Sequence, residues 1–279
     1  MSKTAETAVP PPIAIAAFAG WNDAGAAATD TVTFIAEALE AEPFAVIDPE
    51  GYCDFQVNRP QAKFDADGNR HLLWPTTDFL EGSANGRRLV LVNGVEPSFR
   101  WRSYCDEVLE VLASRGIEQL IILGALLADV PHTRPVPIKV TSLSTKLSKS
   151  LALEPSTYEG PAGIVSVLEV AAWHNLALPS LAMWAAVPHY VAATPSPKAQ
   201  LALLGEVELQ LGTEFDKTDL FQEATSWQEG VDSLAAEDSE VAEYVAKLEE
   251  AKDTLDSPAA TGEALAKEFE RYLRRHKAD

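Results

Sequence analysis

The stretch IAIAAFAGWNDAGAAATDTVTFIAEAL, residues 13–39, indicates the fold class. Its first six residues form an unbroken apolar run that is typical of a buried strand, and Gly20 marks the turn that follows. From Ala24 to Leu39, apolar residues recur at the spacing of an amphipathic helix. A strand, a tight turn and a helix in succession are how an α/β protein begins.

The same alternation of strand and helix continues along the chain. We expect further strands at 44–47, 72–74, 89–92, 119–123, 138–140 and 180–186, and helices after residue 98, at 164–175 and at 197–211. The run 89–92 is apolar at every position, which suits a central strand that is buried on both faces. Turn and polar residues between 51 and 68 predict a partly irregular excursion. The fold class is therefore α/β, with a largely parallel sheet that helices cover on both faces.

The composition changes after Gly212, where Asp, Glu, Ala and Lys become dominant. Apolar residues near helical spacing predict a helical appendage, which Ser257-Pro258 breaks before a last helix at 263–275. The expected organisation is a flexible N-terminal arm at 1–12, an α/β core domain at 13–212 and an acidic helical C-terminal subdomain at 213–279.

Charge excludes two classes of partner. The formal net charge is −20, with 42 acidic and 22 basic residues, and such a field repels both nucleic acid and anionic membranes. No window approaches the roughly 18 apolar residues of a spanning helix, and the N-terminus lacks the features of a secretory signal. Two cysteines are too few for a disulfide framework. We therefore expect a cytoplasmic protein.

Polar residues gather just after the predicted strands, and before the helix at 164–175. By this criterion the candidate members of one site are Asn22, Asp23, Glu96, Asp129, His132, Glu159 and His189. In open α/β sheets, ligands bind in the crevice outside the strand ends, so five loops are expected to converge on one cavity. Its acidity favours a cationic, amine-bearing or hydroxylated ligand, or a divalent metal with oxygen ligands, although no spacing specifies a metal.

The loop that follows the strand at 119–123 carries three different polar groups between prolines. Asp129, His132 and Arg134 supply an acid, an imidazole and a guanidinium on a restricted backbone. A structural reading stands beside the functional one: Asp129 and Arg134 would form an ion pair, and His132 would bond a carbonyl. In the same way, Asn22 or Asp23 would cap a helix, and Glu159 would meet a helix dipole.

Four segments, FAGWNDAG (18–25), GALLADVPHTRP (124–135), YEGP (158–161) and WAAVPHY (184–190), resemble the bacterial, actinobacterial branch of the proteasome assembly chaperone 2 family. The resemblance covers roughly residues 13–211. It implies a three-layer α/β/α sandwich, like that of phosphorylases and peptidyl-tRNA hydrolases, with a small helical C-terminal part. The eukaryotic namesake acts as a chaperone in assembling the proteasome core, so the resemblance also implies protein partners.

Two hypotheses of function follow. The first is a protein-binding or assembly factor within a homo-oligomer, with no cofactor specified. The alternative is a hydrolase- or phosphorylase-type enzyme for a small polar ligand, with Asp129 or Glu159 as general base and His132 as proton donor. Its ligand contacts would come from Asn22, Asp23, Glu96, Arg134, Tyr158 and His189. Familiar catalytic patterns are absent from the sequence, including the Gly-x-Ser-x-Gly elbow, His-Glu-x-x-His, a phosphate loop and Cys-x-x-Cys.

Overall fold

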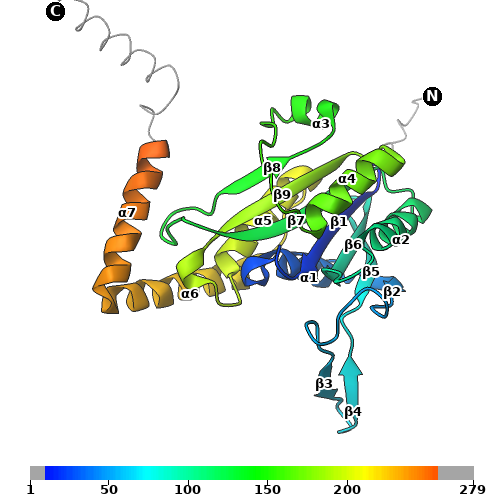
Figure 1. Cartoon of the computed structure of the whole chain (residues 1–279), viewed down its shortest axis with the longest axis horizontal. Coiled ribbons are helices and arrows are strands. Elements are labelled where there is room, and N and C mark those ends of the chain that lie inside the picture. The colour runs from blue at the N-terminus through cyan, green and yellow to red at the C-terminus, as the bar shows by residue number, and fades with distance from the viewer. Residues whose placement is uncertain (1–9, 257–279) are drawn as a thin grey trace, which may run out of the picture.

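A computed structural model describes residues 10–256 of the 279, and within them a mixed sheet of seven strands lies between two layers of helices (Figure 1). In spatial order the strands are β2 (Glu42–Ile47), β5 (Thr77–Ala84), β6 (Arg87–Val95), β1 (Ile13–Ala19), β7 (Gln119–Ala128), β9 (Ser180–Pro188) and β8 (Ile138–Thr141). The four central strands, β6, β1, β7 and β9, are parallel to one another. The outer strands join antiparallel. The expected α/β sandwich is confirmed, with its parallel part at the centre.

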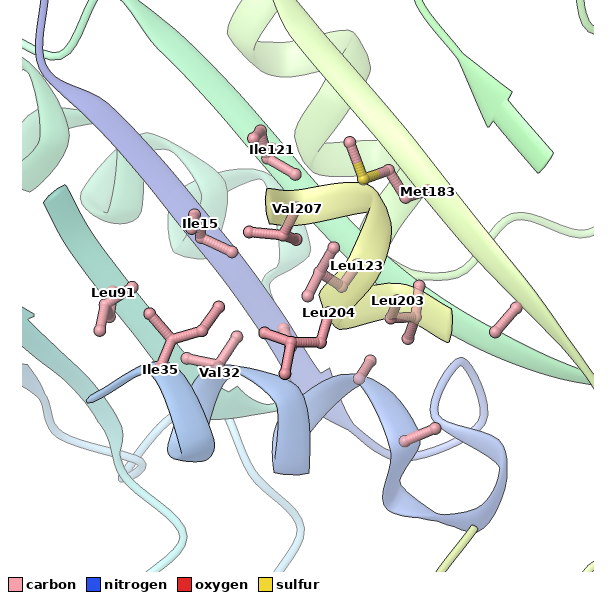
Figure 2. Close-up of a cluster of buried hydrophobic side chains, with 14 of the residues drawn as sticks. Ile15, Val32, Ile35, Leu91, Ile121, Leu123, Met183, Leu203, Leu204 and Val207 are labelled. Carbon is pink, nitrogen blue, oxygen red and sulfur yellow. The ribbon is translucent and has the colours of Figure 1, made fainter. Parts of the chain in front are cut away.

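The two faces of the sheet bury alternate residues of each strand, as the period of two requires. Ile13 and Ile15 of β1 pack under α1 (Ala27–Ala38) and α5 (Pro197–Leu211), a core drawn in Figure 2. Ala16 and Phe18 point the other way, toward α2 (Trp101–Ser114) and α4 (Ile164–Leu176). Because β1 is buried on both sides, its sequence is apolar at every position.

The excursion between β2 and β5 contains more structure than the sequence predicted. The expected strand at 72–74 is β4 (Arg70–Leu73), which pairs with β3 (Gln61–Phe64) in a separate two-stranded sheet. That hairpin projects away from the body of the protein (Figure 1). The partly irregular excursion expected at 51–68 contains β3, a strand that the sequence analysis did not identify. β5, which was not predicted, joins β6 through Asn85 and Gly86, both at positive φ.

Two long helices follow α5 and its C-terminal glycine, Gly212. They are α6 (Thr218–Glu237) and α7 (Ser239–Asp256), and the chain turns between them at Asp238, whose carboxylate accepts the backbone N–H groups of Glu240 and Val241. Helical structure after residue 213 is therefore confirmed, whereas the division into two domains stays a prediction. The expected break at Ser257-Pro258, the helix at 263–275 and most of the N-terminal arm lie outside the described residues.

Candidate functional site

The turn from β1 into α1 directs its polar residues inward. Asp23 is buried, and its carboxylate accepts hydrogen bonds from Ala28 N (2.7 Å), Thr29 Oγ1 (2.5 Å) and Thr29 N (3.4 Å). Burial raises the pKa of Asp23, and the hydrogen bonds from Thr29 and Ala28 act in the opposite direction. The capping reading of Asp23 thus matches the geometry, since this carboxylate satisfies N–H groups that have no partner within the helix.

Asn22 and Glu96 meet beside Asp23. The amide nitrogen of Asn22 donates to the carbonyl of Phe18 (2.7 Å), and Glu96 Oε1 accepts the N–H of Ile164 (2.9 Å) at the start of α4. Both side chains lie so close to Gly163 that a Cβ atom there would come within 2.9 Å of Asn22 Oδ1 and 3.2 Å of Glu96 Oε1. Asp23 therefore joins the end of β1 to α1, Glu96 joins the end of β6 to α4, and Asn22 bonds back to β1.

A second group of predicted residues lies elsewhere because β7 and β9 are longer than expected. β7 runs to Ala128, five residues past Leu123, which carries the following loop about 16 Å beyond the predicted strand end. β9 continues beside it to Pro188, paired with Ala128. Asp129, His132 and the short helix η2 (His189–Val191) are thus carried away from Asn22 and Glu96.

His132 is buried at the junction with α6. Its ring Nδ1 lies 2.7 Å from Tyr190 Oη, and its Nε2 lies 2.9 Å from Asp232 Oδ1 on α6. The backbone N–H of His132 also donates to Tyr190 Oη (2.8 Å), and its carbonyl accepts from Lys198 Nζ. Because Tyr190 already accepts that N–H, its own proton is available to Nδ1, which leaves the ring proton on Nε2 for Asp232. The imidazole therefore connects the loop to the C-terminal helices.

Arg134 and Asp129 make further contacts with α7. The guanidinium of Arg134 pairs with Glu249 (3.1 Å) and Asp253 (2.7 Å). Asp129 lies 3.2 Å from His189 Nδ1 and accepts from Tyr244 Oη (3.1 Å), although its side chain is 80% exposed. The expected pairing of Asp129 with Arg134 is not the observed one, since each meets a different partner.

Tyr158 and Glu159 lie apart from both groups, in an exposed loop before α4. The hydroxyl of Tyr158 donates to the carbonyl of Pro161 (2.9 Å), and Glu159 is exposed. The predicted residues thus occupy two separate groups, one around buried Asn22 and Asp23 and one around buried His132, and one exposed loop, so the structure does not bring the five loops together in one cavity. A groove of about 680 Å³ between α1 and the β5–β6 pair is lined by none of them.

Large apolar side chains point outward from the loops that follow β1 and β6, from the end of β7 and from the loop before α4. Trp21, beside buried Asn22, is 82% exposed, Tyr158 is 68% exposed, and Phe99 after β6 is 52% exposed. Leu126 and Leu127, near the end of β7, are also exposed. The sequence analysis named Tyr158 as a ligand contact but missed the other four residues, because it sought polar groups, although Trp21 and Phe99 were visible in the loops after two strands.

Two further structural findings concern ions and membranes. In the part of the chain that the structure describes, no group of three or more His, Cys, Asp or Glu side chains is placed to hold a metal ion. Among the same residues, no helix is both long enough and apolar enough to cross a membrane.

The fold and its loops define the protein as a three-layer α/β sandwich with two C-terminal helices that contact the loop following β7. The PAC2 family model matches residues 17–235, and the chain belongs to the PAC2 family. No curated protein is significantly similar to it in sequence.

Among solved structures, a PAC2 family protein from Streptomyces avermitilis is 47% identical, with a TM-score of 0.79, and the match covers 84% of this chain and 99% of that one. The Mycobacterium tuberculosis proteasome-assembly chaperone homologue Rv2125 is 44% identical, with a TM-score of 0.75 and the same coverage of 84% and 99%. Pyrococcus furiosus PbaA, an archaeal homolog of proteasome-assembly chaperone, shares the fold at 17% identity, with a TM-score of 0.57 over 88% of this chain and 96% of that one.

Proposed function

We propose that the chain is a cytoplasmic protein-binding factor that assists assembly, and that its partner contacts the loops that hold Trp21, Phe99 and Tyr158. The observation that carries the proposal is the orientation of side chains in those loops. Polar residues such as Asn22 and Asp23 turn inward to hold the fold, whereas Trp21, Phe99 and Tyr158 turn outward. Exposed Trp and Tyr side chains are the kind that dominate binding energy at protein interfaces.

Family membership supplies the class of partner. The Mycobacterium tuberculosis relative at 44% identity is a proteasome-assembly chaperone homologue. The structure of this chain matches 99% of that relative's chain. We infer that the partner is a subunit of the proteasome core. Assembly factors need an exposed apolar surface that a partner covers during assembly. The exposed side chains of Trp21, Phe99 and Tyr158 provide apolar surface of this kind.

The enzyme hypothesis requires its catalytic groups to lie close together. Its proposed groups, Asp129, His132 and Glu159, would have to meet near one reacting atom. Asp129 contacts His189 and Tyr244, His132 is buried against Tyr190 and Asp232, and Glu159 lies in a separate exposed loop. These positions support the binding hypothesis over the catalytic one.

The test compares assembly of proteasome core subunits with and without the protein. We expect the wild-type chain to accelerate assembly on native gels, and the double variant Trp21→Ala/Tyr158→Ala to lose most of that effect. Leu209→Ala is the matched control, because Leu209 is also an exposed apolar residue but lies on α5. Equal acceleration by the double variant, or none by the wild type, would contradict the proposal. Circular dichroism establishes that every variant is folded.

A further inference from the structure

The groove between α1 and the β5–β6 pair has the size of a small-molecule site. Its volume is about 680 Å³, and such sites in proteins run to roughly 300–1,000 Å³. Apolar side chains from both walls line it, Ala36 from α1, Leu80 from β5 and Val95 from β6. Neither Trp21 nor Tyr158 takes part, so the groove is separate from the surface that is proposed above to bind a partner.

The charged groups of this groove are all acidic. Asp30, Glu37, Glu40 and Asp78 line it, and no Lys, Arg or His does. Among the residues that the structure describes, none of the four carboxylates forms an ion pair. Four negative charges therefore line the groove without a cation beside them.

Asp30 shows that this arrangement opposes ionisation. Burial raises the pKa of Asp30 to about 6, and the charges of Asp23 and Glu223 act in the same direction. A half-buried carboxylate among like charges is stabilised in its ionised form when a cation comes beside it. The groove thus favours a positively charged occupant.

The spacing of the carboxylates indicates the shape of that occupant. Asp30 and Glu37 lie seven residues apart on α1, which places them on one face of the helix, about 10 Å apart along its axis. A single metal ion could not be held by both, because its oxygen ligands lie within about 2.0–2.6 Å of it. An extended organic cation with more than one charge can reach both.

Apolar surface accompanies the charges. Trp74, whose side chain is 48% exposed, also lines the groove, and an indole ring attracts ammonium groups. Methylene groups would be removed from water against Ala36, Leu80 and Val95, while ammonium groups would donate hydrogen bonds to the carboxylates. A linear polyamine has both parts, since methylene chains separate its ammonium groups.

We propose that this groove binds a linear polyamine in an extended form, with one ammonium group at Asp30 and another at Glu37. A basic peptide carries the same kind of charge. However, its backbone N–H and C=O groups would have to leave water against the apolar walls without hydrogen-bond partners, which is costly. The polyamine has no such groups and fits the groove better.

Isothermal titration calorimetry of the full chain with spermidine tests the proposal. Salt at about 0.15 M screens the diffuse attraction that a net charge of −20 exerts on any cation. The groove variant is Asp30→Asn/Glu37→Gln. The matched control, Glu240→Gln/Glu250→Gln, removes the same charge from exposed positions of α7. Circular dichroism establishes that both variants are folded.

We expect one spermidine to bind per wild-type chain and the groove variant to bind it at least about tenfold more weakly, because two ion pairs in the groove are lost. The control variant should bind within about twofold of the wild type, since exposed charges contribute little. Butylamine, which has a single ammonium group, should bind much more weakly than spermidine. An equal loss in both variants, or no saturable binding by the wild type, would overturn the proposal.

A second measurement needs no substitution in the groove. In NMR spectra of the wild type, the indole N–H signal of Trp74, assigned with Trp74→Phe, should shift as spermidine saturates the chain. An unshifted signal at saturation would place the polyamine elsewhere and overturn the proposal. Trilysine is titrated in the same way, and tighter binding of trilysine than of spermidine would assign the groove to a basic peptide instead.

Discussion

Replacement of Asp23 by Ala tests whether the inward-facing polar residues hold the fold. The carboxylate has two short hydrogen bonds, to Ala28 N at 2.7 Å and to Thr29 Oγ1 at 2.5 Å, and a longer one to Thr29 N at 3.4 Å. Each buried donor left without a partner costs about 1–3 kcal/mol. Burial of the carboxylate, which raises its pKa, offsets part of this loss. We expect Asp23→Ala to lower the free energy of unfolding by about 2–4 kcal/mol.

Urea denaturation followed by circular dichroism at pH 7 measures the effect. Asp23→Asn keeps one oxygen acceptor and should lose less than the alanine variant. Trp21→Ala is the matched control at the neighbouring exposed position, where a change within about 0.5 kcal/mol is expected. If Asp23→Ala were as stable as the wild type, or if Trp21→Ala lost as much stability as Asp23→Ala, the conclusion that Asp23 points inward to hold the fold and Trp21 points outward would be refuted.

Three further predictions concern the loop contacts and a buried acid. Arg134→Ala removes the ion pairs with Glu249 and Asp253 and should speed hydrogen exchange across α7 with little change in the sheet; unchanged exchange in α7 would count against these contacts. Asp129→Ala should remain folded and lose less than about 1 kcal/mol in urea, since the side chain is largely exposed, and unfolding would contradict this. Burial raises the pKa of Glu169 from 4.5 to about 7, so its ionisation disfavours the folded state as pH rises from 4.5 to 7; Glu169→Gln should therefore raise Tm at pH 8 but not at pH 4, and an equal effect at both would contradict this.

The central fold could be predicted because its signals are local. The apolar run from Ile13 and the helical spacing after Ala24 lie next to each other in sequence, and both elements are present. β3 could not be identified from a buried pattern, since all its residues are exposed, whereas the apolar end of β4 gave the strand expected at 72–74. β5 was missed for a different reason: Asn85-Gly86 is a strong hairpin signal between two strands, and the sequence analysis did not use it.

The candidate site was predicted less well because loop position does not give side-chain direction. Sequence placed Asn22, Glu96 and His132 after strands, and the structure agrees. It could not show that β7 continues past Gly124 to Ala128, which separates His132 from the other two. Nor could it show that α6 and α7 supply partners for the loop, since those contacts join residues about a hundred positions apart.

The outward orientation of Trp21, Phe99 and Tyr158 leads to a direct test of the proposed function. Hydrogen–deuterium exchange of the protein, with and without proteasome core subunits, would locate the bound surface. We predict that binding slows exchange in the segments 20–25, 96–99 and 155–163, which hold Trp21, Phe99 and Tyr158, and leaves α5 unchanged. Protection confined to other segments, or no protection at concentrations where the subunits assemble, would contradict the assignment of this surface to protein binding.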